Sequence, residues 1–103
     1  MMQKATVLKM NNGIHISSHY NDRYRERIAR TKRIEKFAND AYIFGRAIDN
    51  VQDTRLRKYL IHIDENHDKD CTLRVYKGFI HVFDALTLTA ITVYRVPNKF
   101  ALR

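Results

Sequence analysis

A short turn at Lys77-Gly78 is the feature that most constrains the fold of this chain, because it divides two runs of strand-forming residues within positions 71–97. Gly78 can adopt the positive φ that two-residue turns between antiparallel strands require. Closing a hairpin there sets the register of both strands. The resulting pairs, read away from the turn, are Tyr76 with Phe79, Arg74 with His81, and Thr72 with Phe83. A further apolar run before Pro97 predicts a third antiparallel strand.

This register gives the hairpin two different faces, because side chains alternate from one side of a strand to the other. The first face is aliphatic and carries Leu73, Val75, Ile80 and Val82. The second face is aromatic and basic and carries Arg74, Tyr76, Phe79, His81 and Phe83. In the third strand we expect Ile91 and Val93 on the aliphatic face, and Thr92 and Tyr94 on the aromatic face.

A sheet with one aliphatic face is expected to bury that face under helices. The aromatic and basic face is then left at least partly open to solvent, and it is the predicted functional surface. Exposed aromatic side chains are a liability unless they are used. The alternative interpretation is that these aromatics form a second core layer beneath the N-terminal segment.

The residues before the hairpin predict short strands followed by helices. Residues 5–16 indicate a short strand, an Asn-Asn-Gly turn and a second short strand. A helix is expected over about residues 19–30, and either Ser17 or Ser18 can cap its first turn.

Two more helices are expected before the hairpin. Thr31 is the predicted cap of the second, and Gly45 either ends it or lies where another element comes close. The third is expected over about residues 53–65, and the polar residues 64–70 predict a solvated loop. Strands, then helices, then a meander predict a single α+β domain over residues 1–103.

Positive charge is the strongest compositional signal. The chain of 103 residues carries a net charge of +8, and residues 20–60 contain eleven Lys and Arg against six acidic residues. A charge of this size is an argument about partners rather than about fold. It predicts RNA or another nucleic acid as a partner, or an acidic protein such as an antitoxin or a host factor.

Several classes of site and location are disfavoured. Cys71 is the only cysteine, so no internal disulfide forms, and we expect a cytoplasmic protein. No apolar run approaches the length of a membrane span, so no membrane partner is expected. The spacing of His62 and His67 does not suit two metal ligands on one helical face, and no glycine-rich nucleotide loop is present. We therefore predict neither a metal site nor a cofactor.

Two motifs resemble a known family. The pattern Ile16-Ser-Ser-His19-x3-Arg23-x3-Arg27 precedes the helices, and a meander ending in Thr92-Val93-Tyr94 follows them. In this order of elements, most of the chain resembles the RelE/ParE-like superfamily of small phage and bacterial proteins. The resemblance implies the fold shared by barnase-type, colicin-type and RelE-type ribonucleases, with helices packed on one face of an antiparallel sheet. Members include RNA endoribonucleases and gyrase-directed toxins.

The residue types also suit RNA cleavage without a metal. The reaction needs a general base, a general acid and positive charge on the scissile phosphate. Histidine suits the first two roles and arginine the third, so His19, His81 and Arg74 are the predicted catalytic residues. The predicted phosphate- and RNA-binding residues are Arg23, Arg27, Tyr76, Thr92 and Tyr94.

Each candidate also has a purely structural interpretation. His81 can be a packed core residue, His19 can belong to the capping turn, and Arg23 and Arg27 can be solvated charges that pair with acidic neighbours. Two functions therefore stay open: a toxin-like, metal-independent endoribonuclease, and a non-catalytic protein that binds nucleic acid or an acidic host protein. Convergence of His19 and His81 on one accessible site would favour the enzyme.

Overall fold

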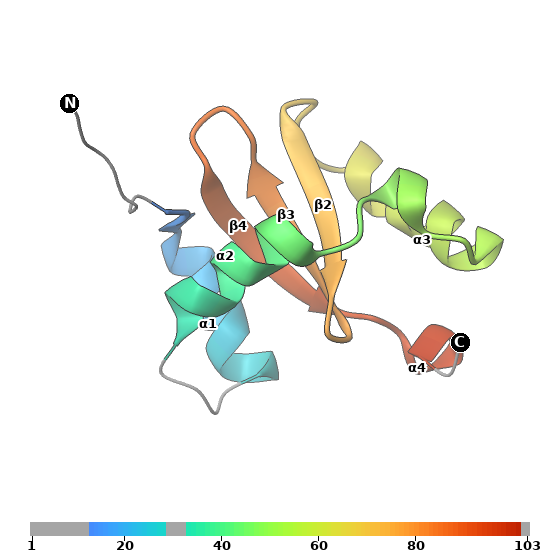
Figure 1. Ribbon diagram of the computed structural model, residues 1–103, viewed down its shortest axis with the longest axis horizontal. Helices are drawn as coiled ribbons and strands as arrows, with labels where there is room; N and C mark the ends of the chain where they lie inside the picture. The colour runs from blue at the N-terminus through green and yellow to red at the C-terminus, as the bar shows by residue number, and fades with distance from the viewer. Residues whose placement is uncertain (1–12, 29–32, 102–103) are drawn as a thin grey trace.

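In this computed structural model, which describes residues 13–28 and 33–101, a short strand, three helices and a meander follow the order expected from the sequence, while the short helices at residues 48–50 and 98–101 were not expected (Figure 1). In chain order they are β1 (His15–Ile16), α1 (Ser18–Arg27), α2 (Ile34–Phe44), the short 3₁₀ helix η1 (Ile48–Asn50), α3 (Thr54–Glu65), β2 (Cys71–Tyr76), β3 (Phe79–Asp84), β4 (Thr89–Arg95) and α4 (Asn98–Ala101). The predicted strand and turn within residues 5–12 lie outside the described residues, and so does the predicted cap at Thr31.

Strands β2, β3 and β4 form the predicted antiparallel meander, and β1 pairs with β4 in parallel to give the order β1-β4-β3-β2. Lys77 and Gly78 have φ values of 51° and 85°, the two positive values that a type I′ hairpin turn requires. The predicted register is confirmed in each pair: Tyr76 with Phe79, Arg74 with His81, and Thr72 with Phe83.

Helices cover both faces of the sheet. Helix α2 crosses β2 and β3 (Figure 1), and together with α1 it packs on the aromatic face. The buried cluster on that side comprises Ile14, Tyr20, Tyr24, Ala38, Ala41, Phe83, Ala90 and Val93. Helices α3 and α4 pack on the aliphatic face, where the cluster comprises Val51, Leu60, Ile63, Leu73, Ile80, Val82, Val96 and Phe100. The α+β class is confirmed, and because both faces of the sheet are apolar each has its own covering layer.

The third strand, β4, has its two faces the opposite way round from the prediction. Val93 lies opposite His81 and therefore joins the aromatic face, while Thr92 and Tyr94 lie on the aliphatic face. Alternation along a strand predicts which residues share a side, but the pairing register decides which face each set occupies. The turn at residues 85–88 and an irregularity in β4, where Ile91 has no partner in β3, set that register here.

Side-chain caps start two of the helices, one of them at the predicted cap Ser17 and the other at Asp53. Ser17 accepts a hydrogen bond of 3.0 Å from the backbone N–H of Tyr20, and Asp53 accepts two from the first turn of α3. Such caps satisfy N–H groups that have no partner within the helix. The Ser17 hydroxyl also donates to the carbonyl of Ile91 at 3.0 Å, so the cap ties α1 to β4.

Helix α2 ends at Gly45, where it meets the edge of the sheet. A Cβ atom placed on Gly45 would lie 2.8 Å from the Cβ of Arg74 and would also clash with the carbonyl of Ala41. Real Cβ contacts are not this short, so the position needs glycine. Both predicted roles of Gly45 therefore apply, because it ends the helix and it allows the close approach of β2.

Candidate functional site

The middle of the aromatic face is closed to solvent. His81 and Phe83 are fully buried, and Tyr20 and Tyr24 of α1 are buried against them. The α2 residue Phe37 adds a ring 5.2 Å from that of His81, measured between centroids. The second core layer that the sequence left as an alternative is thus present over this part of the sheet.

His81 is a neutral core residue in this arrangement. Burial lowers its pKa to about 4, against a smaller opposing effect of the backbone of Tyr76. Its Nδ1 shares a hydrogen bond of 2.9 Å with the hydroxyl of Tyr20, whose own pKa is raised by burial and by the nearby Tyr24. A general acid or base must reach the proton that it transfers. Because α1 and α2 cover His81, its ring does not reach a substrate held at the surface.

The other two predicted catalytic residues lie elsewhere. His19 is exposed on α1, so it does not share an accessible site with the buried His81. The Arg74 guanidinium donates to the Thr72 hydroxyl at 2.7 Å and lies 5.3 Å from the ring centroid of Tyr42. The three side chains therefore do not form one acid–base constellation in the structure.

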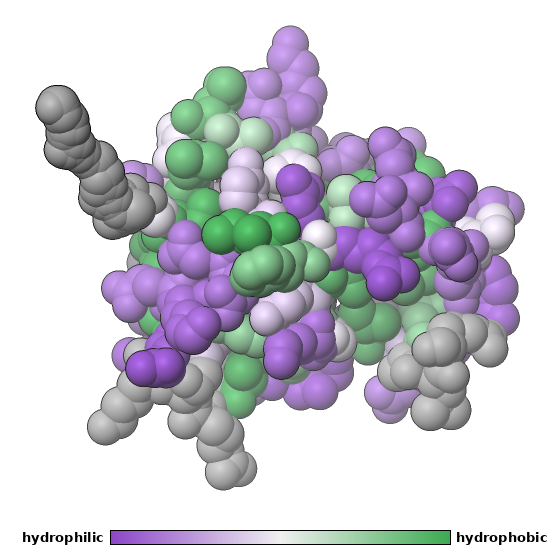
Figure 2. Space-filling view, viewed as in Figure 1, coloured by the Kyte–Doolittle hydropathy of each residue, from purple (hydrophilic) through white to green (hydrophobic). Residues whose placement is uncertain are grey.

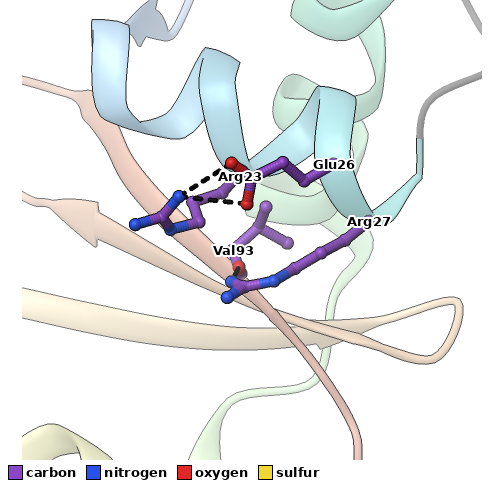
Figure 3. Close-up of polar contacts among 4 residues, drawn as sticks. All are labelled: Arg23, Glu26, Arg27 and Val93. Carbon is purple, nitrogen blue, oxygen red and sulfur yellow. Dashed lines mark hydrogen bonds and ion pairs between the residues drawn. The ribbon is translucent and has the colours of Figure 1, made fainter.

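Arg23 and Arg27, the two arginines of α1 that were predicted to bind RNA, make different contacts (Figure 3). Arg23 forms an exposed ion pair of 3.0 Å with Glu26, one turn along the helix. Arg27 instead donates to the backbone carbonyl of Val93, and its guanidinium lies 5.8 Å from the ring centroid of Tyr94. Arg23 is therefore a solvated charge paired with an acidic neighbour, as in its structural interpretation. Arg27 joins α1 to β4 through a hydrogen bond.

Thr92 and Tyr94 are not on the surface where RNA binding was expected. Thr92 is buried, and Tyr94 packs against the α3 and α4 side of the sheet. The Tyr94 hydroxyl shares a hydrogen bond of 3.2 Å with Nε2 of His67. Both residues follow the reversed orientation of β4.

One end of the aromatic face stays accessible, next to the β2–β3 turn. Tyr76 and Phe79 are half-buried there, and exposed basic groups lie over their rings. The Lys77 ammonium lies 5.7 Å from the centroid of Tyr76, and the Arg95 guanidinium 5.3 Å from that of Phe79. Tyr76 is the one predicted RNA-binding residue that this end contains. The basic residues beside it were missed, although Tyr76-Lys77 and Tyr94-Arg95 are aromatic–basic neighbours in the sequence.

A cavity of about 440 Å³ opens beside this turn. Its lining residues come from α2 and the hairpin: Arg33, Lys36, Phe37, Asp40, Tyr76 and Lys77. Lys36 forms an ion pair of 2.9 Å with Asp40, which offsets part of the positive charge. We call the cavity, together with Phe79 and Arg95, the hairpin-end surface.

Across the described parts of the chain, no three His, Cys, Asp or Glu side chains are grouped so that they could hold a metal ion. No helix in residues 13–28 or 33–101 has the length and apolar character needed to span a membrane.

The two buried tyrosines of α1 provide a matched test of the core around His81. Tyr20→Phe removes the hydrogen-bond partner of His81 and is expected to lower the free energy of unfolding by about 1–2 kcal/mol. Tyr24→Phe removes a buried hydroxyl that has no partner among the described residues, so it is expected to leave stability unchanged or raise it by up to about 1 kcal/mol. Urea unfolding measures both, and equal losses in the two variants would contradict this assignment.

Comparison of the chain with models of protein families, with curated proteins and with solved structures found no match.

Proposed function

We propose that this protein binds RNA or another single-stranded nucleic acid through the hairpin-end surface. The observation that carries the proposal is the pair of aromatic–basic contacts, Lys77 with Tyr76 and Arg95 with Phe79, at the open end of the sheet. The adjoining cavity adds Arg33 and further aromatic surface. No other part of the sheet face on this side leaves its aromatic residues as accessible within the described residues.

The physical fit is with an unpaired strand. Proteins that bind single strands combine basic groups along the phosphate backbone with aromatic rings on which bases stack, and each stacked base contributes about 1–3 kcal/mol. A base that stacks on Tyr76 takes the place of Lys77 above the ring, and the ammonium can then contact a phosphate. Arg95 also donates to the backbone carbonyl of Arg27 at 2.9 Å, and its remaining N–H groups can contact a phosphate beside a base on Phe79. The net charge of +8 strengthens the attraction at long range.

The geometry favours binding over cleavage. The endoribonuclease suggested by the RelE/ParE resemblance would use His19, His81 and Arg74, and His81 is fully buried. The hairpin-end surface supplies cations and rings, and it contains no histidine that could transfer a proton. We therefore propose a non-catalytic, nucleic-acid-binding function in preference to an endoribonuclease.

The test compares two double charge reversals that change the net charge equally. Lys77→Asp with Arg95→Glu removes the proposed contacts, and aspartate tolerates the positive φ of the turn at residue 77. Because Arg95 also donates to the backbone carbonyl of Arg27 at 2.9 Å, circular dichroism must first show that this variant keeps the fold of the parent. Arg55→Glu with Lys58→Glu alters exposed residues of α3 and serves as the control. Arg27 is left unchanged because its bond to Val93 supports the fold.

Fluorescence anisotropy with labelled oligouridine, titrated at several salt concentrations, measures the effect. We expect the hairpin-end variant to bind at least about tenfold more weakly and to lose roughly 1.4 from the slope of log K against log salt, about 0.7 for each lost contact to a single strand. The control should lose far less. Equal weakening in both variants, or binding by the parent that does not depend on salt, would overturn the proposal. Oligouridine incubated with the protein is then run on a denaturing gel. Oligouridine that stays intact shows binding without cleavage.

A further inference from the structure

An exposed apolar pair lies at the C-terminal end of α2, away from the hairpin-end surface. Ile43 and Phe44 are 66% and 71% exposed, although they are large apolar residues in the last turn of a helix. Figure 2 shows an apolar area over this end of α2, with hydrophilic residues around it. Adjacent exposed apolar side chains rimmed by polar groups mark interaction sites.

Two arginines flank the pair. The close approach of Gly45 places Arg74 beside the end of α2, and the Arg74 guanidinium lies 5.3 Å from the ring centroid of Tyr42. Arg46 is exposed, and both its backbone N–H and its carbonyl bond to Val75 of β2, which holds it at the edge of the sheet. Within the described residues neither arginine forms an ion pair with a carboxylate.

We propose that this α2-end patch, made of Ile43, Phe44, Arg46 and Arg74, docks an acidic segment of another protein that also carries apolar side chains. Apolar groups of the partner would cover the helix end, and its carboxylates would pair with the two guanidinium groups. Aromatic and arginine side chains are enriched among the residues that dominate binding energy at interfaces. Arginine also binds carboxylates with two parallel hydrogen bonds, which adds specificity.

Charge and residue type favour an acidic segment of another protein over the other possible occupants of the α2-end patch. A second copy of the chain that docks through the same patch would set arginines against arginines, and it carries the same net charge of +8. Residues 1–12 contain two lysines and no acidic residue, so they lack the groups that Arg46 and Arg74 would pair with. A nucleic acid strand would use the Phe44 ring for stacking but would leave the aliphatic Ile43 uncovered.

The experiment selects ligands without assuming the partner. A library of short random peptides is panned against the full chain, and Phe44→Ser serves as the counter-target because its exposed side chain can be changed without opening the core. Peptides that survive should be acidic and should contain large apolar residues. Synthetic versions should lose affinity more than about tenfold on Phe44→Ser and on Arg46→Glu. Arg55→Glu with Lys58→Glu, the α3 control, should bind as the parent does.

Three results would overturn the proposal. The first is the absence of enriched peptides, or enrichment of peptides that are basic or bind Phe44→Ser equally well. The second is a dimer in sedimentation that depends on Phe44, which would make a second copy the occupant. The third is weaker oligouridine binding by Phe44→Ser, which would make nucleic acid the occupant. Lys77→Asp with Arg95→Glu should retain peptide binding, so the outcome is independent of the proposed nucleic-acid function.

Discussion

Acidification from neutrality to about pH 4 is expected to lower the free energy of unfolding by roughly 3 kcal/mol through His81 alone. The folded protein holds the pKa of His81 at about 4 because the ring is buried, whereas the unfolded chain exposes it with a pKa near 6.5. Between these values the unfolded chain takes up a proton that the folded protein does not. Stability from this group is therefore full above about pH 6.5, falls as the pH drops, and levels off below about pH 4.

Urea unfolding of the parent and of His81→Phe at a series of pH values isolates this contribution. Carboxylates also titrate in this range, so the quantity to compare is the difference between the two pH profiles. The stability of His81→Phe should depend less on pH than the stability of the parent does. The variant also lacks the hydrogen bond to the Tyr20 hydroxyl, but that loss is present at every pH and does not change the slope. Leu86→Ala, which changes an exposed residue and removes no titratable group, is the control and should keep the slope of the parent. Parallel profiles for the parent and His81→Phe would show that folding does not lower the pKa of His81.

Phe83→Ala is expected to cost about 3–5 kcal/mol of unfolding free energy. Phe83 is fully buried between the sheet and the two helices of the aromatic face. Its ring packs 5.1 Å from that of Tyr42 and 6.2 Å from that of His81, measured between centroids. The loss is large because deletion of the ring leaves a cavity that the rigid neighbours cannot fill.

Chemical unfolding monitored by circular dichroism measures this loss. Leu86→Ala is the matched control, since Leu86 lies in the adjoining turn and is 75% exposed, and it should stay within about 0.5 kcal/mol of the parent. Phe83→Leu, with an expected loss of about 1–2 kcal/mol, keeps the test informative if the alanine variant does not fold. A Phe83 variant as stable as the Leu86 control would mean that α1 and α2 do not cover this face.

The hairpin could be predicted from the sequence because its constraints are local. Lys77 and Gly78 define a turn of fixed length, and that length sets the pairing of β2 with β3. The cap at Ser17 is local in the same way, because it depends on one side chain and the next few backbone groups. Short-range chemistry therefore accounts for the correct part of the fold.

The candidate site depended on long-range packing, which local patterns do not contain. Nothing in the alternation of Arg74, Tyr76 and His81 tells whether helices cover one face of the sheet or both. Tyr20 and Tyr24 are spaced to bury one side of α1, but their target on the sheet follows only from the assembled fold. Phe83 and His81 were therefore assigned to an open surface that α1 and α2 in fact cover.

The hydrogen bonds that join α1 and its cap to β4 also limit the addition of a further strand to this sheet. Along β4 the carbonyl of Ala90 accepts from the Ser17 N–H, that of Ile91 from the Ser17 hydroxyl, and that of Val93 from Arg27. At the opposite edge, β2 has both backbone groups of Val75 bonded within the chain. A strand from a second molecule finds these edge positions already taken, and unpaired edges are what allow sheets to join into aggregates. By occupying the carbonyl of Val93, Arg27 removes one of the acceptors that a strand from a second molecule would need.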